Sequence, residues 1–346
     1  MTENGEPFLP GPTFAAPYHL SGDPAESEFT YGRFDNPTWR AYEQALGELE
    51  GDEALVFGSG MGAISTLLLA LLEQGDRIVL PSDAYYTVRS LAHELLPYEV
   101  HEVPSDTAAF VDAAARAKLV WVETPSNPGL DVVDIRAVAD ASDATLVVDN
   151  TLVTPLGQRP LELGADYVVA SASKALTGHS DLLLGYVAAP DVQLVRAARS
   201  KVGTIAGPFE VWLAHRSLAT LDVRLERECA NALRLAEAIA ERVPVRYPGL
   251  PGDPAHETAK QQMERFGPVL CFTLPDAATA DAFLAAAEMI TEATSFGGTR
   301  TTAERRARWG GDDVPEGYVR LSAGCEDTDA LVQDVKRALA SALGRS

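Results

Sequence analysis

The feature that most constrains the fold of this 346-residue chain is the alternation of short apolar runs with segments of helical periodicity. The runs lack the polar alternation of a half-exposed strand, so we expect strands buried on both faces, as in a mostly parallel sheet covered by helices. The runs are Ala54–Phe57, Arg77–Leu80, Tyr98–Val103, Leu119–Val122, Thr145–Val148 and Tyr167–Ala170.

The rest of the chain predicts an N-terminal arm and a second domain. Residues 1–45 are rich in Pro, Gly, Tyr and Phe with little periodicity, which is typical of an extended arm that packs on a neighbouring subunit. We expect an α/β domain over residues 46–220, followed over residues 221–346 by a linking helix and a smaller α+β domain. The linking helix belongs to a helical stretch from Phe209 to about Val243. The expected C-terminal elements are strands at Val269–Leu274 and Tyr318–Ser322 and helices at Ala277–Ala287 and Thr328–Leu343.

Composition argues against several kinds of partner. Lys and Arg total 28 against 50 Asp and Glu, and the resulting charge of −22 opposes binding to nucleic acid or to anionic membranes. The cysteines Cys229, Cys271 and Cys325 are far apart, which argues against a disulfide framework or a metal site. We find neither a signal-like leader nor an apolar run long enough to cross a bilayer, so we expect a cytoplasmic protein.

Residues suited to chemistry follow three of the apolar runs, where α/β sheets bind their ligands. The turn Ser59-Gly60-Met61 leads into a helix and offers N–H groups to a phosphate, although a tight turn alone would need the same glycines. Asp149 ends one run as either a helix cap or the partner of a cation. Lys174 follows another run; it is one of only five lysines, and small hydroxyl residues surround it.

These three features together match one cofactor, pyridoxal phosphate. That cofactor needs a lysine amine for a Schiff base, a carboxylate beside the pyridine nitrogen and donors for its phosphate. A single bound molecule would therefore explain the glycine-rich turn, the acid and the lysine.

The chain resembles the Cys/Met-metabolism family of pyridoxal-phosphate enzymes, which includes cystathionine γ-lyase, cystathionine γ-synthase and methionine γ-lyase. The resemblance extends from about Tyr18 to the C-terminus. It implies a fold type I architecture, similar to aspartate aminotransferase, with a mostly parallel central sheet and a smaller α+β C-terminal domain. The motifs that carry it are Tyr31-Gly32-Arg33, Asn36-Pro37-Thr38, Ser59-Gly60-Met61, Glu123 to Pro128, Val148 to Thr151, Leu163 to Asp166, Ser171 to Lys174, Gly178 to Asp181 and Arg320 to Asp327.

The resemblance implies pyridoxal 5′-phosphate as cofactor and assigns residues to it. Lys174 is expected to carry the cofactor and to move protons, Asp149 to pair with the pyridine nitrogen, and Asn127 to contact the ring hydroxyl. The groups expected to hold the phosphate are the N–H groups of Gly60 and Met61 and the hydroxyls of Ser171 and Ser173.

The resemblance also implies a role for the arm and for the substrate side of the site. Tyr31 and Arg33 are expected to reach the phosphate of a neighbouring subunit, which makes a dimer the catalytic unit, with dimers pairing into tetramers. Arg320 is expected to bind the substrate α-carboxylate, and Ser295 to lie beside that carboxylate and the lysine. Tyr85 is expected to stack on the cofactor ring and to exchange protons.

Two stretches depart from the family pattern. Tyr85-Tyr86-Thr87 is one residue shorter than the family's Tyr-Gly-Gly-Thr, so either tyrosine could stack on the cofactor. Arg300 stands where the family has a glutamate near the distal end of the substrate. It would repel a distal ammonium such as that of cystathionine, favour a distal anion such as a succinyl ester, or face solvent.

These assignments predict a carbon–sulfur lyase that cleaves a γ-substituted L-amino acid by α,γ-elimination, as cystathionine γ-lyase does, giving a 2-oxo acid, ammonia and a thiol. The alternatives are γ-replacement, as in cystathionine γ-synthase or an acylhomoserine sulfhydrylase, methionine γ-lyase activity, and γ-elimination on an unusual amino acid. A non-catalytic scaffold is disfavoured because Lys174 and Asp149 are both present.

Overall fold

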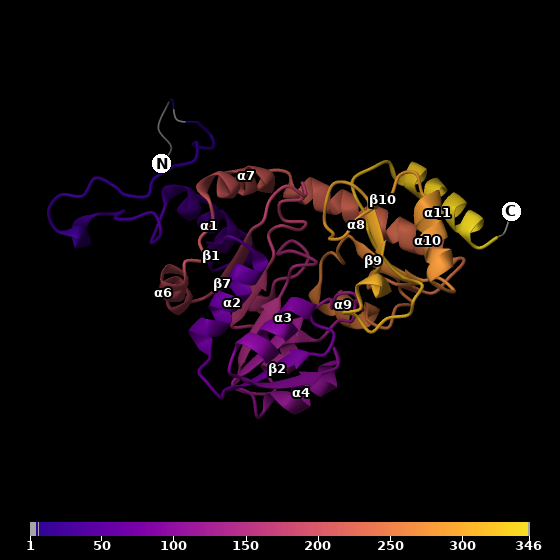
Figure 1. The fold of residues 1–346 in the computed structure, drawn as a ribbon, viewed down its shortest axis with the longest axis horizontal. Coiled ribbons are helices and arrows are strands. Elements are labelled where there is room, and N and C mark those ends of the chain that lie inside the picture. Colours follow the sequence, from indigo (N-terminus) through magenta and orange to yellow (C-terminus); the bar gives the residue numbers. More distant parts are fainter. Residues whose placement is uncertain (1–4, 6, 345–346) are drawn as a thin grey trace.

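The computed structural model describes residue 5 and residues 7–344 and contains two β-sheets connected by a long helix (Figure 1). The N-terminal sheet has the strand order β1-β7-β6-β5-β4-β2-β3. β7 runs antiparallel to both of its neighbours, and the other pairs are parallel, so the predicted mostly parallel α/β fold is confirmed. The strands are β1 (Glu53–Phe57), β2 (Arg77–Pro81), β3 (Glu99–Val103), β4 (Leu119–Glu123), β5 (Thr145–Asp149), β6 (Tyr167–Ala170) and β7 (Gly185–Ala189).

Helices cover both faces of this sheet, as continuous apolar strands require. Along β1, Leu55 and Phe57 pack with α2, whereas Val56 points to the opposite core beside α1 and α7. The helices of this part are α1 (Pro37–Glu50), α2 (Gly60–Leu71), α3 (Tyr86–Ser90), α4 (Thr107–Ala114), α5 (Ile135–Ala139), α6 (Gln193–Val202) and α7 (Pro208–Leu218).

The helical stretch predicted over residues 209–243 is two helices, α7 and α8 (Leu221–Ala240). The backbone leaves helical geometry at Thr220, and the break is stabilised because Thr220 Oγ1 and Arg224 Nη2 both donate to the carbonyl of Ser217 at 3.2 Å. α8 then runs from the N-terminal part to the second sheet (Figure 1).

The second sheet has the strand order β10-β11-β12-β9-β8, and α8, α10 and α11 pack against it around one apolar core. The prediction named β9, β12, α10 and α11 but missed the short strands and α9. The elements observed after α8 are β8 (Val245–Arg246), α9 (His256–Gln262), β9 (Val269–Thr273), α10 (Ala277–Ala286), β10 (Thr291–Glu292), β11 (Thr302–Arg305), β12 (Tyr318–Ser322) and α11 (Thr328–Ala342).

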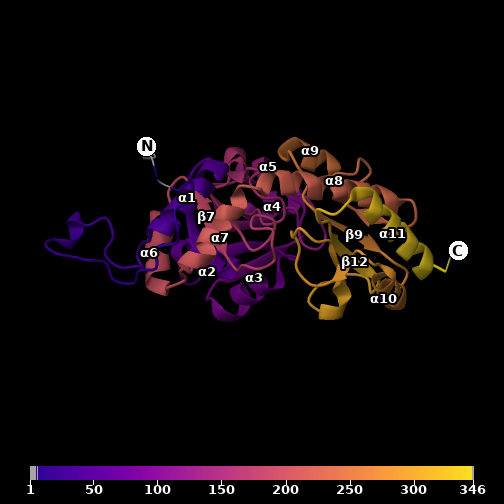
Figure 2. The ribbon, with the colours of Figure 1, turned by 90° about the horizontal axis from the view of Figure 1, so that it is seen from above.

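The extended part of the arm ends at Asn36 rather than at residue 45. Asn36 Oδ1 accepts a 2.8 Å hydrogen bond from the Thr38 N–H, and Pro37 occupies the first turn, so α1 begins there. The preceding segment projects from the N-terminal domain in both views (Figures 1 and 2), and Pro17 pairs with Tyr31 across its base. Residues 1–4 and 6 of the predicted arm, and 345–346 of the predicted C-terminal domain, lie outside the described residues.

Among the described helices, none combines the length and the hydropathy needed to span a bilayer.

Candidate active site

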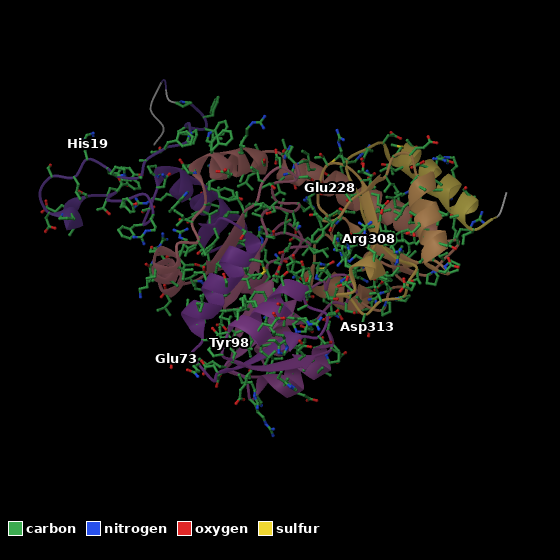
Figure 3. All side chains as sticks on the ribbon, viewed as in Figure 1. His19, Glu73, Tyr98, Glu228, Arg308 and Asp313 are labelled. Atoms are coloured by element: carbon green, nitrogen blue, oxygen red, sulfur yellow. The ribbon has the colours of Figure 1, made fainter. Side chains whose placement is uncertain are left out.

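A cavity of about 440 Å³ lies at the carboxyl ends of the parallel strands β4, β5 and β6, and both sheets contribute side chains to its wall. Side chains from the two parts of the chain fill the region between them, and Arg308 marks the C-terminal side (Figure 3). The predicted site residues that line the cavity are Gly60, Met61, Tyr85, Asn127, Asp149, Ser171, Ser173, Lys174, Ser295 and Arg320.

The amine of Lys174 faces this cavity. Its Nζ donates a 2.6 Å hydrogen bond to Ser295 Oγ and lies 5.2 Å from the centre of the Phe296 ring. Burial and, next, the charge of Arg320 lower the pKa of Lys174 to about 8, against the opposing effect of the Glu304 carboxylate. An amine with this pKa is partly uncharged near neutral pH and can act as a nucleophile or a base.

The linking helix α8 holds the loop that follows Lys174 in place. Arg224 of α8 donates to the carbonyls of Ala175 at 2.9 Å and Leu176 at 3.1 Å. Gly178 has a φ of +72°, and a Cβ at this position would collide with the Arg224 guanidinium. The glycine is therefore required by the backbone conformation and by the close approach of the arginine.

Two carboxyl groups lie side by side on the opposite wall. Glu123 and Asp149 end β4 and β5 at paired positions in the register. Burial raises the pKa of Asp149 to about 6, and the hydrogen bonds from Thr151 oppose this shift. The pKa of Glu123 is raised well above its usual range by burial and then by the charge of Asp149. Glu123 also accepts a 2.8 Å hydrogen bond from the Tyr85 N–H, which anchors the start of α3.

The start of α2 forms a cradle next to Ser171. Ser59 Oγ caps the helix by accepting from the Gly62 N–H at 2.9 Å. The N–H groups of Gly60 and Met61 belong to the first turn, where a helix offers no carbonyl for them to bond. A Cβ on Gly60 would lie 2.9 Å from Ser171 Cβ, so only glycine permits this approach. Ser173 Oγ already bonds the peptide groups of Leu184, donating at 3.1 Å and accepting at 2.9 Å.

Arg320 is 4% exposed and points into the cavity. Its Nη1 donates to Asn127 Oδ1 at 2.6 Å, and its Nη2 donates to Glu304 Oε1 at 2.6 Å and to the carbonyl of Ser295 at 3.4 Å. The guanidinium is thus held by three acceptors beside the Lys174 amine, in a position suited to a substrate carboxylate.

Three predicted site residues lie outside the wall of this cavity. Arg33 donates to the carbonyl of Ser200, and its guanidinium lies 4.8 Å from the Phe34 ring centre. Tyr31 is in the arm, 42% exposed. Arg300 is exposed and does not belong to the cavity wall, so its predicted contact with the substrate has no counterpart within one subunit.

Both candidate tyrosines line the cavity. The rings of Tyr85 and Tyr86 meet edge to face at 5.0 Å and are 39% and 55% exposed. Glu123 fixes the backbone of Tyr85 by accepting a hydrogen bond from its N–H. The stacking of Tyr85 on the cofactor ring remains a prediction.

Sequence reasoning missed several residues of the cavity wall. Glu123 could have been found, because it opens the Glu-Thr-Pro-Ser-Asn-Pro motif and follows an apolar run. Arg306, Trp309 and the buried Glu304 behind them lie in an arginine-rich stretch with no motif signal, so nothing in the sequence distinguishes them from a solvated surface.

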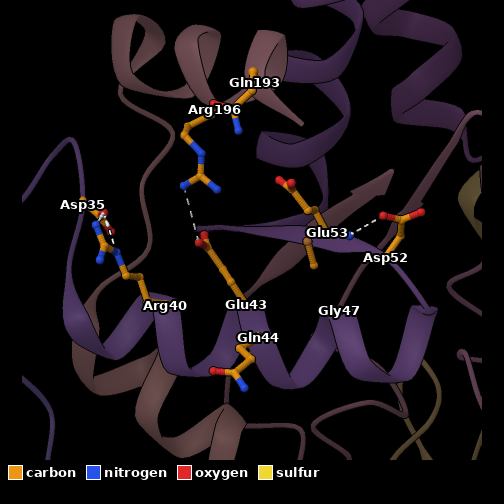
Figure 4. Close-up of a pocket in the computed structure, with 10 residues that line it drawn as sticks. Asp35, Arg40, Glu43, Gln44, Gly47, Asp52, Glu53, Gln193 and Arg196 are labelled. Atoms are coloured by element: carbon orange, nitrogen blue, oxygen red, sulfur yellow. Dashed lines mark hydrogen bonds and ion pairs between the residues drawn. The ribbon is translucent and has the colours of Figure 1, made fainter. Parts of the chain in front are cut away.

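A second hollow lies beside the arm and is open to solvent. Its volume is about 680 Å³, and it includes Arg40 and Glu43 of α1 and Arg196 of α6 (Figure 4). None of the predicted site residues lines it, and Glu43 is engaged in structure, since it accepts from the buried Arg199 at 2.6 Å. We therefore assign the chemistry to the first cavity.

The first cavity fits pyridoxal phosphate. The buried carboxylate of Asp149 is bonded by Thr151, whose N–H donates to Oδ1 at 3.0 Å, and it faces the cavity, where it can pair with a protonated pyridine nitrogen. The start of α2 offers N–H groups to a phosphate, and Lys174 offers an amine. Since Asn127 Oδ1 is taken by Arg320, its amide NH₂ is the group available to the ring hydroxyl.

Comparison with known proteins identifies the family. Residues 12–340 match the family described as Cys/Met metabolism PLP-dependent enzyme. A Streptomyces coelicolor protein, provisionally named cystathionine γ-lyase, is 55% identical over 350 residues, which cover 96% of this chain and 89% of that protein. The L-methionine γ-lyase of Pseudomonas putida is 38% identical over 339 residues, covering 89% of this chain and 84% of that enzyme.

A solved structure gives the same result. Cystathionine γ-synthase from Xanthomonas oryzae pv. oryzae in complex with cystathionine superposes with a TM-score of 0.92 at 33% identity, covering 98% of this chain and 94% of that chain. The predicted fold type I architecture is therefore confirmed, and pyridoxal phosphate is the cofactor. The chain belongs to the Cys/Met metabolism family of PLP-dependent enzymes.

Proposed function

We propose that this chain is a lyase that cleaves a γ-substituted L-amino acid by α,γ-elimination, with L-cystathionine as the leading substrate. The observation that carries the proposal is the position of the Lys174 amine, 2.6 Å from Ser295 Oγ and beside the buried guanidinium of Arg320. A substrate whose carboxylate binds Arg320 would present its Cα proton to this amine.

Each residue then has a defined task. Bound pyridoxal phosphate supplies the electron sink that permits loss of the Cα proton. Lys174 Nζ takes this proton and, after giving it up to the bound cofactor, would be free to remove a second proton from Cβ. The electron pair of that C–H bond forms the Cβ–Cγ double bond as the sulfur leaves Cγ as a thiolate, which takes up a proton to give the thiol. Addition of water yields the 2-oxo acid and ammonia. Asp149 keeps the pyridine nitrogen protonated, and Ser295 Oγ holds the lysine amine in line.

The second candidate is γ-replacement, in which an added thiol captures the substrate after the γ-substituent has left. It is supported by similarity to solved cystathionine γ-synthases and by Arg306, a cation in the cavity wall that an anionic acyl ester could approach. The guanidinium of Arg306 is already paired with Glu304 and Asp312, which favours elimination of a substituent without net negative charge, such as the zwitterionic cysteine of cystathionine.

One experiment tests the proposal. The purified holoenzyme is given L-cystathionine alone, L-methionine alone, or an acylhomoserine with cysteine, and 2-oxo acid, thiol and cystathionine are measured. We expect 2-oxo acid from cystathionine, lost in Lys174→Ala and retained in the control Lys201→Ala, an exposed lysine. Borohydride should trap the cofactor on Lys174. Product formed only with an acylhomoserine and cysteine would replace elimination with γ-replacement.

The proposed catalytic unit is a dimer, which pairs into a tetramer in the cytoplasm. Tyr31 and Arg33 directly follow the segment that projects from the N-terminal domain (Figure 2), and this supports their predicted reach to a neighbouring phosphate. The proposed divisions are the arm, a cofactor domain up to residue 220 and a C-terminal domain from residue 221.

A further inference from the structure

Glu304 is a fully buried carboxylate behind the substrate side of the cavity. It lies on β11 directly opposite Arg320 of β12 in the antiparallel register. Its oxygens accept five hydrogen bonds or ion pairs from the surrounding wall. The donors are Arg320 Nη2 at 2.6 Å, Arg306 Nη1 and Trp309 Nε1 at 2.8 Å each, and Arg308 Nη2 and Thr294 Oγ1 at 3.3 Å each.

Four of these five donors belong to residues that line the cavity, and Arg308 is the exception. Arg306 and Arg320 share a single oxygen of Glu304, so their two guanidinium groups are held close together. Without the carboxylate these like charges would repel each other in a buried space. The direction of Arg320 therefore depends on Glu304.

We propose that Glu304 is a positioning residue that aims Arg320 at the substrate α-carboxylate and fixes Arg306 and Trp309 as the adjoining wall. The inference rests on the proposed function only in taking Arg320 as the carboxylate-binding group. It adds a residue that touches neither substrate nor cofactor but sets the geometry and charge of the groups that do.

The charge of Glu304 supports this role. Burial raises its pKa, but the Trp309 hydrogen bond and the charges of Arg320 and Arg306 outweigh burial, and the net pKa lies below the usual range. Glu304 is therefore ionised at neutral pH. It also raises the pKa of Lys174, against the stronger effects of burial and Arg320. Removing the charge of Glu304 should therefore lower the pKa of Lys174 and also release the Arg320 guanidinium from its hydrogen bond.

The test uses binding of an unreactive ligand rather than turnover. L-norleucine has no γ-leaving group, and L-norleucinamide lacks the carboxylate, so the ratio of their dissociation constants reports on Arg320 alone. The ratio is measured from the cofactor absorption of the holoenzyme. We expect Glu304→Gln to weaken norleucine binding roughly 10- to 100-fold, the usual cost of disrupting charge-assisted hydrogen bonds, while norleucinamide changes little.

A second readout and a control separate positioning from general damage. In the apoprotein, titration of the Lys174 amine should move to lower pH in Glu304→Gln, whereas Glu304→Asp should keep the titration and lose only part of the binding. Glu292→Gln is the matched control, because Glu292 pairs with the outer side of Arg308 and is exposed.

The inference is overturned if Glu304→Gln keeps the wild-type ratio of norleucine to norleucinamide binding and the wild-type lysine titration. If Glu304→Gln does not fold, wild-type binding by Glu304→Asp overturns it, and a selective loss of norleucine binding supports it. Failure of the proposed function is distinguishable, since a wild-type enzyme without cystathionine cleavage would still reveal the effect on norleucine.

Discussion

Lys174 of the cofactor domain and Ser295 of the C-terminal part, 121 residues apart in sequence, are joined by a 2.6 Å hydrogen bond from amine to hydroxyl. Ser295 adopts a φ of +81°, a left-handed conformation that non-glycine residues rarely take. Backbone strain of this kind costs on the order of 1 kcal/mol and concentrates at functional sites. A serine at this position therefore lowers the stability of the fold. We propose that its hydroxyl, which accepts the hydrogen bond from Lys174, is the reason that a serine is present.

Replacing Ser295 should separate stability from activity. Ser295→Gly relieves the strained backbone and is expected to raise the free energy of unfolding by about 0.5–1 kcal/mol. It removes the Lys174 acceptor, so kcat should fall roughly 10-fold or more. Ser295→Ala should lose the same activity without gaining stability. Denaturant unfolding and steady-state kinetics check both; a fully active Ser295→Gly would contradict the role of the hydroxyl.

Asp149→Asn should stabilise the apoprotein while impairing the enzyme. Burial raises the pKa of Asp149 from 3.8 to about 6, so the native state binds this proton more tightly than the unfolded state. The stability linked to Asp149 therefore falls as pH rises from about 4 to 6 and stays low above. At pH 8 the asparagine should stabilise the apoprotein by about 1–3 kcal/mol. Melting curves at pH 8 and pH 4.5 should show a larger gain at pH 8.

The fold was largely predictable because its strands are encoded locally. All six apolar runs correspond to strands of the N-terminal sheet. β7 was missed because Gly185, Ala188 and Ala189 have low β propensity, and it is a strand only because β1 and β6 pair with it on both sides. The arm boundary and the break at Thr220 were missed for a similar reason, since each depends on a hydrogen bond to a single carbonyl or N–H group.

The site was predictable where a motif marks it. Lys174, Asp149 and Arg320 meet in one cavity as expected. Glu304 and Arg306 were not foreseen, because their importance comes from the pairing of β11 with β12, which brings residues 304 and 320 opposite each other. Arg300 was chosen by its place in a motif, but its side chain is exposed and does not belong to the wall.

Arg320→Lys should be far from conservative. A lysine keeps the positive charge but cannot bond Asn127, Glu304 and a substrate carboxylate together. We expect kcat/KM to fall roughly 100-fold, mostly through a higher KM. Arg305→Lys is the control, because Arg305 pairs with Asp281 and Glu316 away from the cavity. If Arg320→Lys and Arg305→Lys lower kcat/KM equally, Arg320 does not bind the substrate carboxylate.

Arg300→Glu should leave substrate choice nearly unchanged. Within one subunit Arg300 is exposed and has no place in the cavity wall, so reversing its charge acts mainly through solvent. The ratio of kcat/KM for cystathionine to that for methionine is expected to stay within about threefold of the wild type. If the ratio changes by more and the change disappears at high salt, Arg300 acts through a long-range charge effect. If the change persists at high salt, Arg300 contacts the substrate.

The arm makes a prediction that only a mixed dimer can test. If Arg33 completes the site of a partner, Arg33→Ala and Lys174→Ala subunits are each impaired alone. In a hybrid of the two, the subunit that keeps Lys174 receives Arg33 from the other. One whole site is restored, and the hybrid should recover about half of wild-type activity per dimer. Differently tagged subunits are co-expressed, and the doubly tagged species is isolated and assayed.

The matched hybrid excludes simpler explanations. Lys174→Ala paired with the double variant Lys174→Ala/Arg33→Ala contains no catalytic lysine and should stay inactive whatever the arm does. Arg33 lies outside the cavity of its own subunit and bonds the Ser200 carbonyl, so a contribution within the same subunit would require this contact to be abandoned. If the first hybrid is no more active than the Arg33→Ala dimer, Arg33 acts within its own subunit and the dimer is not required for a complete site.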